Sequence, residues 1–408
     1  MGMPRASRGI RASIPEPGIH PVYLLLNADL YTPRKVGRRH LLIVGEGIAW
    51  IGEEIPDLPA SLGVERVDLD GRPVVPGFID GHVHITGGGG EAGFASRVPP
   101  LALSRITRGG ATTVIGLLGT DDVMRSTAEL VARARALCDE GITAYCLAGG
   151  YHLPPTTLTG SVKTDILHVD PILGVGEVAI SDHRSSQPTL DEILRLAADV
   201  RVAGMLAGKA GVLQLHLGRG PRRLDLVRRA LAESELPPRT FHPTHVNLTK
   251  GLLSEAFDLA RAGGVIDVSA FETAEDDDDP SAVESIQAYW EASLPPDGLT
   301  VSSDGGGSMP CFDTRGRLHS MGVGDPTTLA AAFAALVAAG APLELALPPF
   351  TSNVAGLYRL DAKGRLEVGR DADLLVLDEE ARPIDVMARG RWHVRDGEVI
   401  VRGTFEEA

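Results

Sequence analysis

The chain has 408 residues, enough for one large α/β domain of about 250 residues together with a smaller one. Acidic residues outnumber basic ones by 54 to 39, and the net charge of −15 argues against a surface that binds nucleic acid or an anionic membrane. Cys138, Cys146 and Cys311 show no paired spacing, which argues against a disulfide framework and against a cysteine-based zinc site. Small molecules are therefore the expected partners.

The N-terminal segment differs in composition from the rest of the chain. The first 20 residues contain Pro, Ser and Arg with few apolar side chains, which predicts a loose tail. This segment lacks the apolar centre of a signal peptide, and no apolar run approaches the roughly 20 residues that a membrane-spanning helix needs. We expect a cytoplasmic protein without membrane contact.

Short alternating strands separated by turn residues are predicted near both ends of the chain. They occupy residues 23–36, 38–54 and 65–75 at one end, and residues 364–380, 383–397 and 398–403 at the other. The simplest arrangement pairs the two ends into one small β-sandwich, so that the central part is inserted into a discontinuous domain. The expected division is residues 1–20 for the tail, 21–77 and 353–408 for the β-sandwich, and 78–352 for the inserted domain.

The central part alternates between apolar β-rich runs and amphipathic helical segments. Eight β-rich runs are present, at residues 74–84, 112–120, 142–151, 172–184, 211–218, 239–247, 263–272 and 298–308. The helical segments between them include residues 126–141, 190–204, 223–234 and 252–264. Such alternation is typical of an α/β protein of the (β/α)8 TIM-barrel class, whose chemistry lies at the C-terminal ends of its strands.

The first β-rich run ends in two histidines, His82 and His84. Alternate side chains on a strand point the same way, so both imidazoles can bind one metal ion. An isolated H-x-H pair is weak evidence, because two such histidines are often simply buried or solvated. Later runs also end in polar side chains, namely Thr120, Tyr151, Glu177, Arg184, His216, His245, Asp304 and Ser308. Their shared position at predicted strand ends favours a metal-dependent active site.

Several motifs in these runs resemble those of known hydrolases. PGFIDGHVH, the single histidines that close later strands and the SSD segment resemble the amidohydrolase superfamily of metal-dependent hydrolases. HVHITGGGGEAG, GLLGTDD, AISDHRS, PTHVN and SSDGGGS are similar to the isoaspartyl dipeptidase (β-aspartyl peptidase) family, from about His20 to the C-terminus. The resemblance implies a homo-oligomer, such as an octamer, that hydrolyses β-aspartyl dipeptides with two divalent metal ions, usually zinc, and no organic cofactor.

The resemblance also implies the metal ligands residue by residue. His82 and His84 would bind one metal, His216 and His245 the other, and Asp304 would complete the first site. Two adjacent cations lower the pKa of a bridging water and hold the resulting hydroxide against the scissile amide. Asp304 would take the proton from that water and pass it to the leaving amine.

Further residues match family positions that act on the dipeptide. Tyr151 has the position of a tyrosine that polarises the carbonyl and stabilises the oxyanion. Glu91 matches the acidic residue that receives the substrate α-ammonium, while Gly89 and Gly90 bring the backbone close to the ligand. A glycine-rich loop is also often only a flexible connection.

The substrate α-carboxylate would be held by three residues that match family positions, Thr120, Arg184 and Ser308. A guanidinium fork suits a carboxylate, although Arg184 could also form a purely structural ion pair. Leu248 stands where the family has a substrate-binding arginine, so the preferred dipeptide is left open.

The bridge between the two metals is a second departure from the family. Glu177 stands where the family has a carboxylated lysine, and glutamate already carries the bidentate carboxylate that lysine acquires. The resemblance therefore implies a two-metal site that does not depend on bicarbonate. Lys209 is no substitute, because it precedes a predicted strand and so belongs to the opposite end of the barrel.

Asp276, Asp277, Asp278 and Asp279 form an acidic run after the seventh predicted strand. A solvated loop or the start of a helix explains such a run, and an acidic wall that selects a cationic second residue is the functional alternative.

Two other functions are compatible with this chain. A sister amidohydrolase acting on N-acyl amino acids or cyclic amides would use the same metals, but Glu91 and Arg184 together fit the zwitterionic end of an amino acid. A catalytically silent scaffold would have no need of the complete ligand set.

Overall fold

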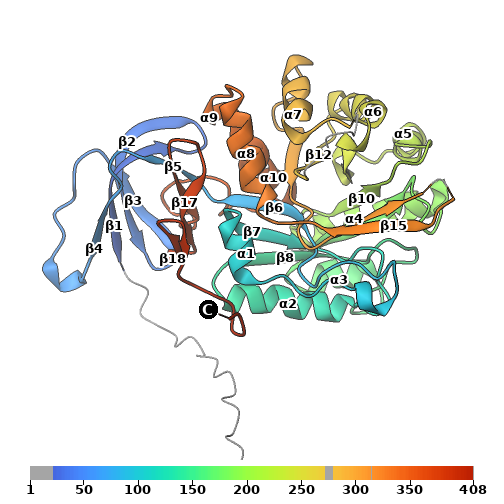
Figure 1. The fold of residues 1–408 in the computed structure, drawn as a ribbon, viewed down its shortest axis with the longest axis horizontal. Helices are drawn as coiled ribbons and strands as arrows, with labels where there is room; N and C mark the ends of the chain where they lie inside the picture. The colour runs from blue at the N-terminus through green and yellow to red at the C-terminus, as the bar shows by residue number, and fades with distance from the viewer. Residues whose placement is uncertain (1–21, 272–278, 314, 408) are drawn as a thin grey trace, which may run out of the picture.

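The computed structural model describes residues 22–271, 279–313 and 315–407, and a curled parallel sheet lies at its centre (Figure 1). One hydrogen-bonded ladder contains β6 (Phe78–Val83), β7 (Ala111–Gly116), β8 (Thr143–Ala148), β9 (Ile172–Ile180), β10 (Val212–Leu217) and β11 (Phe241–Thr244). A second parallel pair consists of β12 (Ile266–Ser269) and β13 (Leu299–Ser302). Each of the eight predicted β-rich runs overlaps one of these strands.

The chain after β13 returns to the first strand of the sheet. A parallel bridge joins Val83 to Gly305, and the amide of His84 donates to the carbonyl of Gly305 at 2.9 Å. The curl of the sheet thus brings its first and last strands together, as an α/β fold of the predicted class requires. Closure into a complete (β/α)8 barrel stays a prediction.

Amphipathic helices connect the parallel strands, as the sequence predicted. Helix α4 begins with a capping box, in which the Thr189 hydroxyl accepts from the Glu192 amide and the Glu192 carboxylate accepts from the Thr189 amide at 2.8 Å. Its buried positions Ile193, Ala197 and Val200 recur at helical spacing and give it one apolar face.

The helices and the last hairpin have the following bounds. The helices are α1 (Leu103–Arg108), α2 (Thr127–Asp139), α3 (Val162–His168), α4 (Leu190–Ala207), α5 (Asp225–Ala232), α6 (Lys250–Arg261), α7 (Ala282–Glu291), α8 (Thr328–Ala338), α9 (Leu343–Ala346) and α10 (Ser352–Tyr358). An antiparallel hairpin of β14 (Ser308–Phe312) and β15 (Leu318–Val323) follows β13. Within the described part of the chain, every helix is too short or too polar to cross a membrane.

Strands from both ends of the chain form a nine-stranded sheet, seen to one side of the parallel sheet in Figure 1. It contains β1 (Tyr23–Tyr31), β2 (Lys35–Val44), β3 (Gly47–Gly52), β4 (Glu65–Asp68), β5 (Pro73–Pro76), β16 (Leu374–Leu377), β17 (Pro383–Ala388), β18 (Arg391–Arg395) and β19 (Glu398–Val399). The two ends meet where β5 pairs in parallel with β1 and antiparallel with β16. A sandwich of two packed layers stays a prediction.

A buried lysine connects the two sheets. Lys363 is 5% exposed, and its Nζ lies 2.7 Å from a carboxylate oxygen of Asp371 and of Asp373, which precede β16. The same nitrogen donates to the hydroxyl of Thr143, at the start of β8, at 2.6 Å. Burial alone would lower the pKa of Lys363, but Asp373 and Asp371 raise it above its ordinary value. The lysine therefore stays charged in the interior.

We predict that Lys363→Met lowers the free energy of unfolding by roughly 3–5 kcal/mol, because it leaves the buried Asp373 carboxylate without its cation. Urea unfolding of the purified variant measures this change. The matched control is Lys35→Met, since Lys35 pairs with Asp29 at 3.0 Å on the surface and its loss should leave the unfolding midpoint almost unchanged. Equal effects of the two substitutions would contradict a special role for the buried pair.

Candidate metal centre

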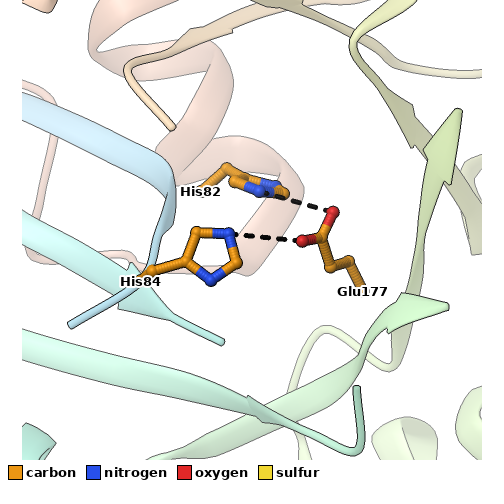
Figure 2. A group of neighbouring side chains, drawn as sticks. All are labelled: His82, His84 and Glu177. Carbon is orange, nitrogen blue, oxygen red and sulfur yellow. Dashed lines mark ion pairs between the residues drawn. The ribbon is translucent and has the colours of Figure 1, made fainter. Parts of the chain in front are cut away.

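Three buried side chains from two strands form one half of a candidate metal centre (Figure 2). His82 lies near the end of β6, His84 follows that strand, and Glu177 belongs to β9. Nε2 of His82 is 3.5 Å from Oε2 of Glu177, and Nε2 of His84 is 3.3 Å from Oε1. Each imidazole thus faces its own oxygen of one carboxylate.

The ends of three further strands complete the group. Nδ1 of His216, on β10, lies 3.0 Å from Oε2 of Glu177, and Nε2 of His245, after β11, lies 3.6 Å from the same oxygen. Oδ1 of Asp304, after β13, is 3.5 Å from His82 and 3.2 Å from His84. The structure therefore brings together all six ligands expected from the sequence.

Two of these ligands have an unusual backbone conformation. His245 and Asp304 have φ values of 59° and 53°, in the left-handed region that residues other than glycine seldom occupy. Such strain persists only where the surrounding structure fixes it, and it is concentrated at functional sites. The conformation turns both side chains toward Glu177 and His82 at the ends of their strands.

The spacing of the ligand atoms fits divalent metal ions. Two ligands that are each roughly 2.1 Å from a tetrahedral zinc ion lie roughly 3.4 Å apart, close to the observed separations. Both ring nitrogens of His82 and Oδ1 of Asp304 are buried without a hydrogen-bond partner among the described residues. Buried polar atoms normally have partners, so these atoms fit the coordination of a cation. Imidazole with carboxylate is a donor set typical of zinc.

The electrostatics of the group also favour bound cations. Burial alone would lower the pKa of His82, but Glu177 and Asp304 raise it well above its ordinary value. Burial would raise the pKa of Glu177, but the neighbouring histidines, His82 and His216 foremost, hold it well below its usual range. The buried carboxylates therefore keep their charge and stabilise positive charge on or between the imidazoles.

The residues expected to contact substrate converge on one carboxylate beside this group. Oε1 of Glu91 accepts hydrogen bonds from the hydroxyl of Thr120 at 3.1 Å, the hydroxyl of Ser308 at 2.7 Å and Nη1 of Arg184 at 3.2 Å. Oε2 of Glu91 is buried without a partner among the described residues. Gly89 and Gly90 have φ values of 83° and 112°, which glycine alone adopts readily.

Tyr151 lies between the metal ligands and the substrate residues. Its hydroxyl is 2.9 Å from Nδ1 of His216, and the guanidinium of Arg184 lies 5.3 Å from the centre of its ring. Burial and the charge of Glu177 raise the pKa of Tyr151 well above its ordinary value. The phenol therefore keeps its proton and can donate it in a hydrogen bond.

One residue of this region, Asp182, was not predicted from the sequence. Its Oδ2 lies 3.1 Å from Nε2 of His216 and 2.9 Å from Nη2 of Arg184. The available signal was its place in the SDHR segment, two residues before Arg184 and two residues after the end of a strand that carries a ligand.

Leu248, the acidic run and Lys209 were also singled out from the sequence, and they lie as follows. The carbonyl of Leu248 accepts from Nη1 of Arg219 at 3.1 Å, so a guanidinium borders this position from the loop after β10. Asp279 also pairs with Arg219, whereas the acidic residues 276–278 fall outside the described residues. Lys209 donates to the carbonyls of Ile166 and Val169, which precede β9, at the end of the sheet opposite Glu177.

A solved structure resembles almost the whole chain. It is a β-aspartyl dipeptidase from Fervidobacterium islandicum AW-1 in complex with the β-Asp-Leu dipeptide, with 37% identity and a TM-score of 0.87. The match covers 93% of this chain and 98% of that chain. The chain belongs to the amidohydrolase superfamily.

Other similar proteins share less sequence identity with this amidohydrolase or match less of its length. A D-hydantoinase with 18% identity and a TM-score of 0.67, covering 94% of this chain and 97% of its own, shares the fold. Imidazolonepropionase from Serratia proteamaculans is 35% identical over 147 residues, which are 34% of this chain and 36% of that protein. The chain thus spans only about a third of such curated relatives. No protein-family model matches it.

We predict that this amidohydrolase binds two divalent ions per chain. The substitution Glu177→Gln should reduce the number of bound ions toward one per chain, because an amide replaces the anionic bridge. Elemental analysis of protein purified without chelator, in buffers with and without bicarbonate, measures the ion content. Bicarbonate should have no effect, since glutamate needs no carboxylation.

The matched control for this prediction is Glu91→Gln, which makes the same chemical change at a carboxylate that hydrogen-bonds none of the histidines. It should keep both ions. Retention of two tightly bound ions by Glu177→Gln would contradict the bridging assignment.

Proposed function

We propose that this protein is a metal-dependent hydrolase of β-aspartyl dipeptides. The observation that carries the proposal is the convergence of Thr120, Arg184 and Ser308 on Glu91 beside the candidate metal centre. A carboxylate that can accept hydrogen bonds from an ammonium group thus lies beside three side chains that can donate hydrogen bonds to a carboxylate. This combination matches a free α-ammonium and a free α-carboxylate on one carbon atom.

The similarity to the Fervidobacterium structure supports the same substrate class. That protein was solved with β-Asp-Leu bound, and it matches this chain at 37% identity over nearly its full length. We extend the proposal to zinc as the native metal, to a homo-oligomeric state and to a cytoplasmic location. The residues expected from the sequence to bind metal and substrate keep those roles in the proposal.

The zwitterionic end of the substrate would be bound by two sets of side chains, one for the α-ammonium and one for the α-carboxylate. The unpartnered Oε2 of Glu91 is available to accept from an α-ammonium. Arg184, Ser308 and Thr120, which now donate to Oε1 of Glu91, are the donors that an α-carboxylate would accept from. Only a peptide joined through the side-chain carboxyl leaves both charged groups free.

The chemical step would use Asp304 and Tyr151. Two divalent ions held by the six ligands would supply the Lewis acidity that activates water and polarises the amide. Burial raises the pKa of Asp304, but His82 and His84 hold it below its usual range, so the carboxylate is ionised and can accept a proton. Asp304 then carries that proton to the leaving amine. Tyr151, still protonated, donates to the developing oxyanion.

The alternative functions fit the geometry less well. A sister amidohydrolase acting on N-acyl amino acids would have no use for the buried Oε2 of Glu91, because acylation removes the ammonium. A cyclic amide likewise has its ring nitrogen acylated and offers no ammonium to this oxygen. A silent scaffold would have no reason to keep six buried ligands in coordination range.

We predict that Asp304→Asn lowers kcat by a hundredfold or more, on the order expected for losing a general base, while KM changes little. The reason is that the amide cannot accept the proton of the attacking water. Steady-state kinetics with β-Asp-Leu and the metal content of the same preparation test this together. A near-normal kcat with both ions present would assign proton transfer to another group.

We also predict strong selectivity among three related compounds. β-Asp-Leu should be cleaved, whereas α-Asp-Leu should react a hundredfold or more slowly, because it has no α-carboxylate to accept from Arg184, a loss on the order of a few kcal/mol. N-acetyl-β-Asp-Leu should also react slowly, since it offers no ammonium to Glu91.

Values of kcat/KM for the three compounds measure this selectivity. The variant Glu91→Gln serves as the internal control, since it should narrow the difference between the free and the acetylated β-peptide. Equal hydrolysis of these two compounds by the wild type would point to a deacylase instead.

A further inference from the structure

Asp182 is a buried carboxylate shared by the candidate metal centre and the substrate-binding arginine. It is 9% exposed and follows β9 by two residues. Its Oδ2 lies 3.1 Å from Nε2 of His216 and 2.9 Å from Nη2 of Arg184. Its Oδ1 accepts from Nε of Arg184 at 3.1 Å and from the Arg184 amide at 2.7 Å. Among the residues that the structure describes, these oxygens bond only His216 and Arg184.

We propose that Asp182 is a positioning residue that fixes His216 for the second metal and orients Arg184 for the substrate carboxylate at the same time. The part that concerns Arg184 rests on the proposed function. The part that concerns His216 rests only on the geometry of the ligands.

On the metal side, Asp182 would select one tautomer of His216. A histidine that binds a metal through one nitrogen commonly donates the other N–H to a carboxylate, which also fixes the orientation of the ring. Here Nε2 faces Asp182, and Nδ1 faces Oε2 of Glu177 at 3.0 Å. A proton on Nε2 leaves Nδ1 unprotonated, so that its lone pair, which now faces the Tyr151 hydroxyl at 2.9 Å as well as Glu177, can bind a cation shared with Glu177.

The opposite tautomer of His216, with its proton on Nδ1, also has a hydrogen-bond donor available to stabilise it. Nη2 of Arg184 lies 3.3 Å from Nε2 of His216 and could donate to it if Nε2 were unprotonated. The proton would then lie on Nδ1 and block metal binding there. Asp182 opposes this state, because its Oδ2 is closer to Nε2 and already accepts from Nη2.

On the substrate side, Asp182 holds the guanidinium by two parallel bonds. This fork fixes the plane of the group and leaves Nη1 pointing at Oε1 of Glu91, 3.2 Å away. Arg184 thereby presents its remaining donors to the position where the substrate α-carboxylate is proposed to bind.

The packing around Asp182 is adapted to this position. A Cβ atom on Gly218, just after β10, would lie 2.6 Å from both Cβ and Oδ2 of Asp182. Contacts this short do not occur, so any side chain at residue 218 would push Asp182 away. Gly218→Ala thus displaces the carboxylate without removing its charge.

The first test is Asp182→Asn, examined by zinc titration of the chelator-treated full-length protein and by kinetics with β-Asp-Leu. An amide nitrogen facing Nε2 would donate to it and favour the blocked tautomer. We expect one of the two ions to bind 10 to 100 times more weakly, on the order seen when such partners are lost. KM should rise about tenfold or more, because Arg184 loses a charged acceptor.

The matched control is Asp122→Asn. Asp122 is another buried carboxylate, and it bonds His152 at 2.9 Å rather than His216 or the guanidinium of Arg184. This control should keep both ions at wild-type affinity. A parallel loss of affinity in both variants would mean that any buried charge matters here, and it would overturn the proposal.

Two further outcomes would overturn it. If Asp182→Asn raises KM but binds both ions as the wild type does, Asp182 only anchors Arg184. If one ion loosens while KM stays constant, the link between the two functions is absent.

Two measurements keep the test decisive if Asp182→Asn does not fold. Gly218→Ala should reproduce both the weaker ion and the higher KM. Nitrogen-15 NMR of the histidines in the zinc-loaded wild type should show the His216 proton on Nε2, and a proton on Nδ1 would overturn the proposal. If the wild type fails to cleave β-Asp-Leu, the proposed function falls, while the zinc titration and the NMR still decide whether Asp182 positions His216.

Discussion

The Glu177 carboxylate is the group around which the rest of this structure is organised. Four histidine nitrogens lie between 3.0 and 3.6 Å from its oxygens, and all of these side chains are buried. Charge and lone pairs gathered at this density are costly in the interior unless cations lie between them. The stabilisation of this buried carboxylate by positive charge accounts for the ligand geometry, for the shifted pKa values and for the expected metal dependence.

The parallel sheet supplies the rigid frame that this arrangement requires. Asp80 lies within β6, where burial raises its pKa to about 7, and it accepts from the amides of His82 at 3.4 Å and Ser303 at 3.1 Å. It thus ties the first strand to the segment that carries Asp304. Ligands at the ends of separate strands can be held within coordination range only when such contacts fix the strands relative to one another.

Recognition and chemistry are joined through a short series of charged contacts. It runs from Glu177 through His216 and Asp182 to Arg184 and then to Glu91. Each of these side chains is paired on both sides, so a change at one member alters the orientation of the next. In a buried network of this kind, single substitutions are expected to have effects that are not additive.

The sequence by itself determined the local features of this protein. It indicated the eight parallel strands and the amphipathic helices, because hydrophobic period is a local property of the chain, and its resemblance to a known family indicated the six candidate ligands. Only the tertiary structure showed that β5 and β16 join the two ends, that Asp182 serves both His216 and Arg184, and that three donors converge on Glu91. These contacts join residues that are distant in the chain, and the curl of the sheet decides which of them meet.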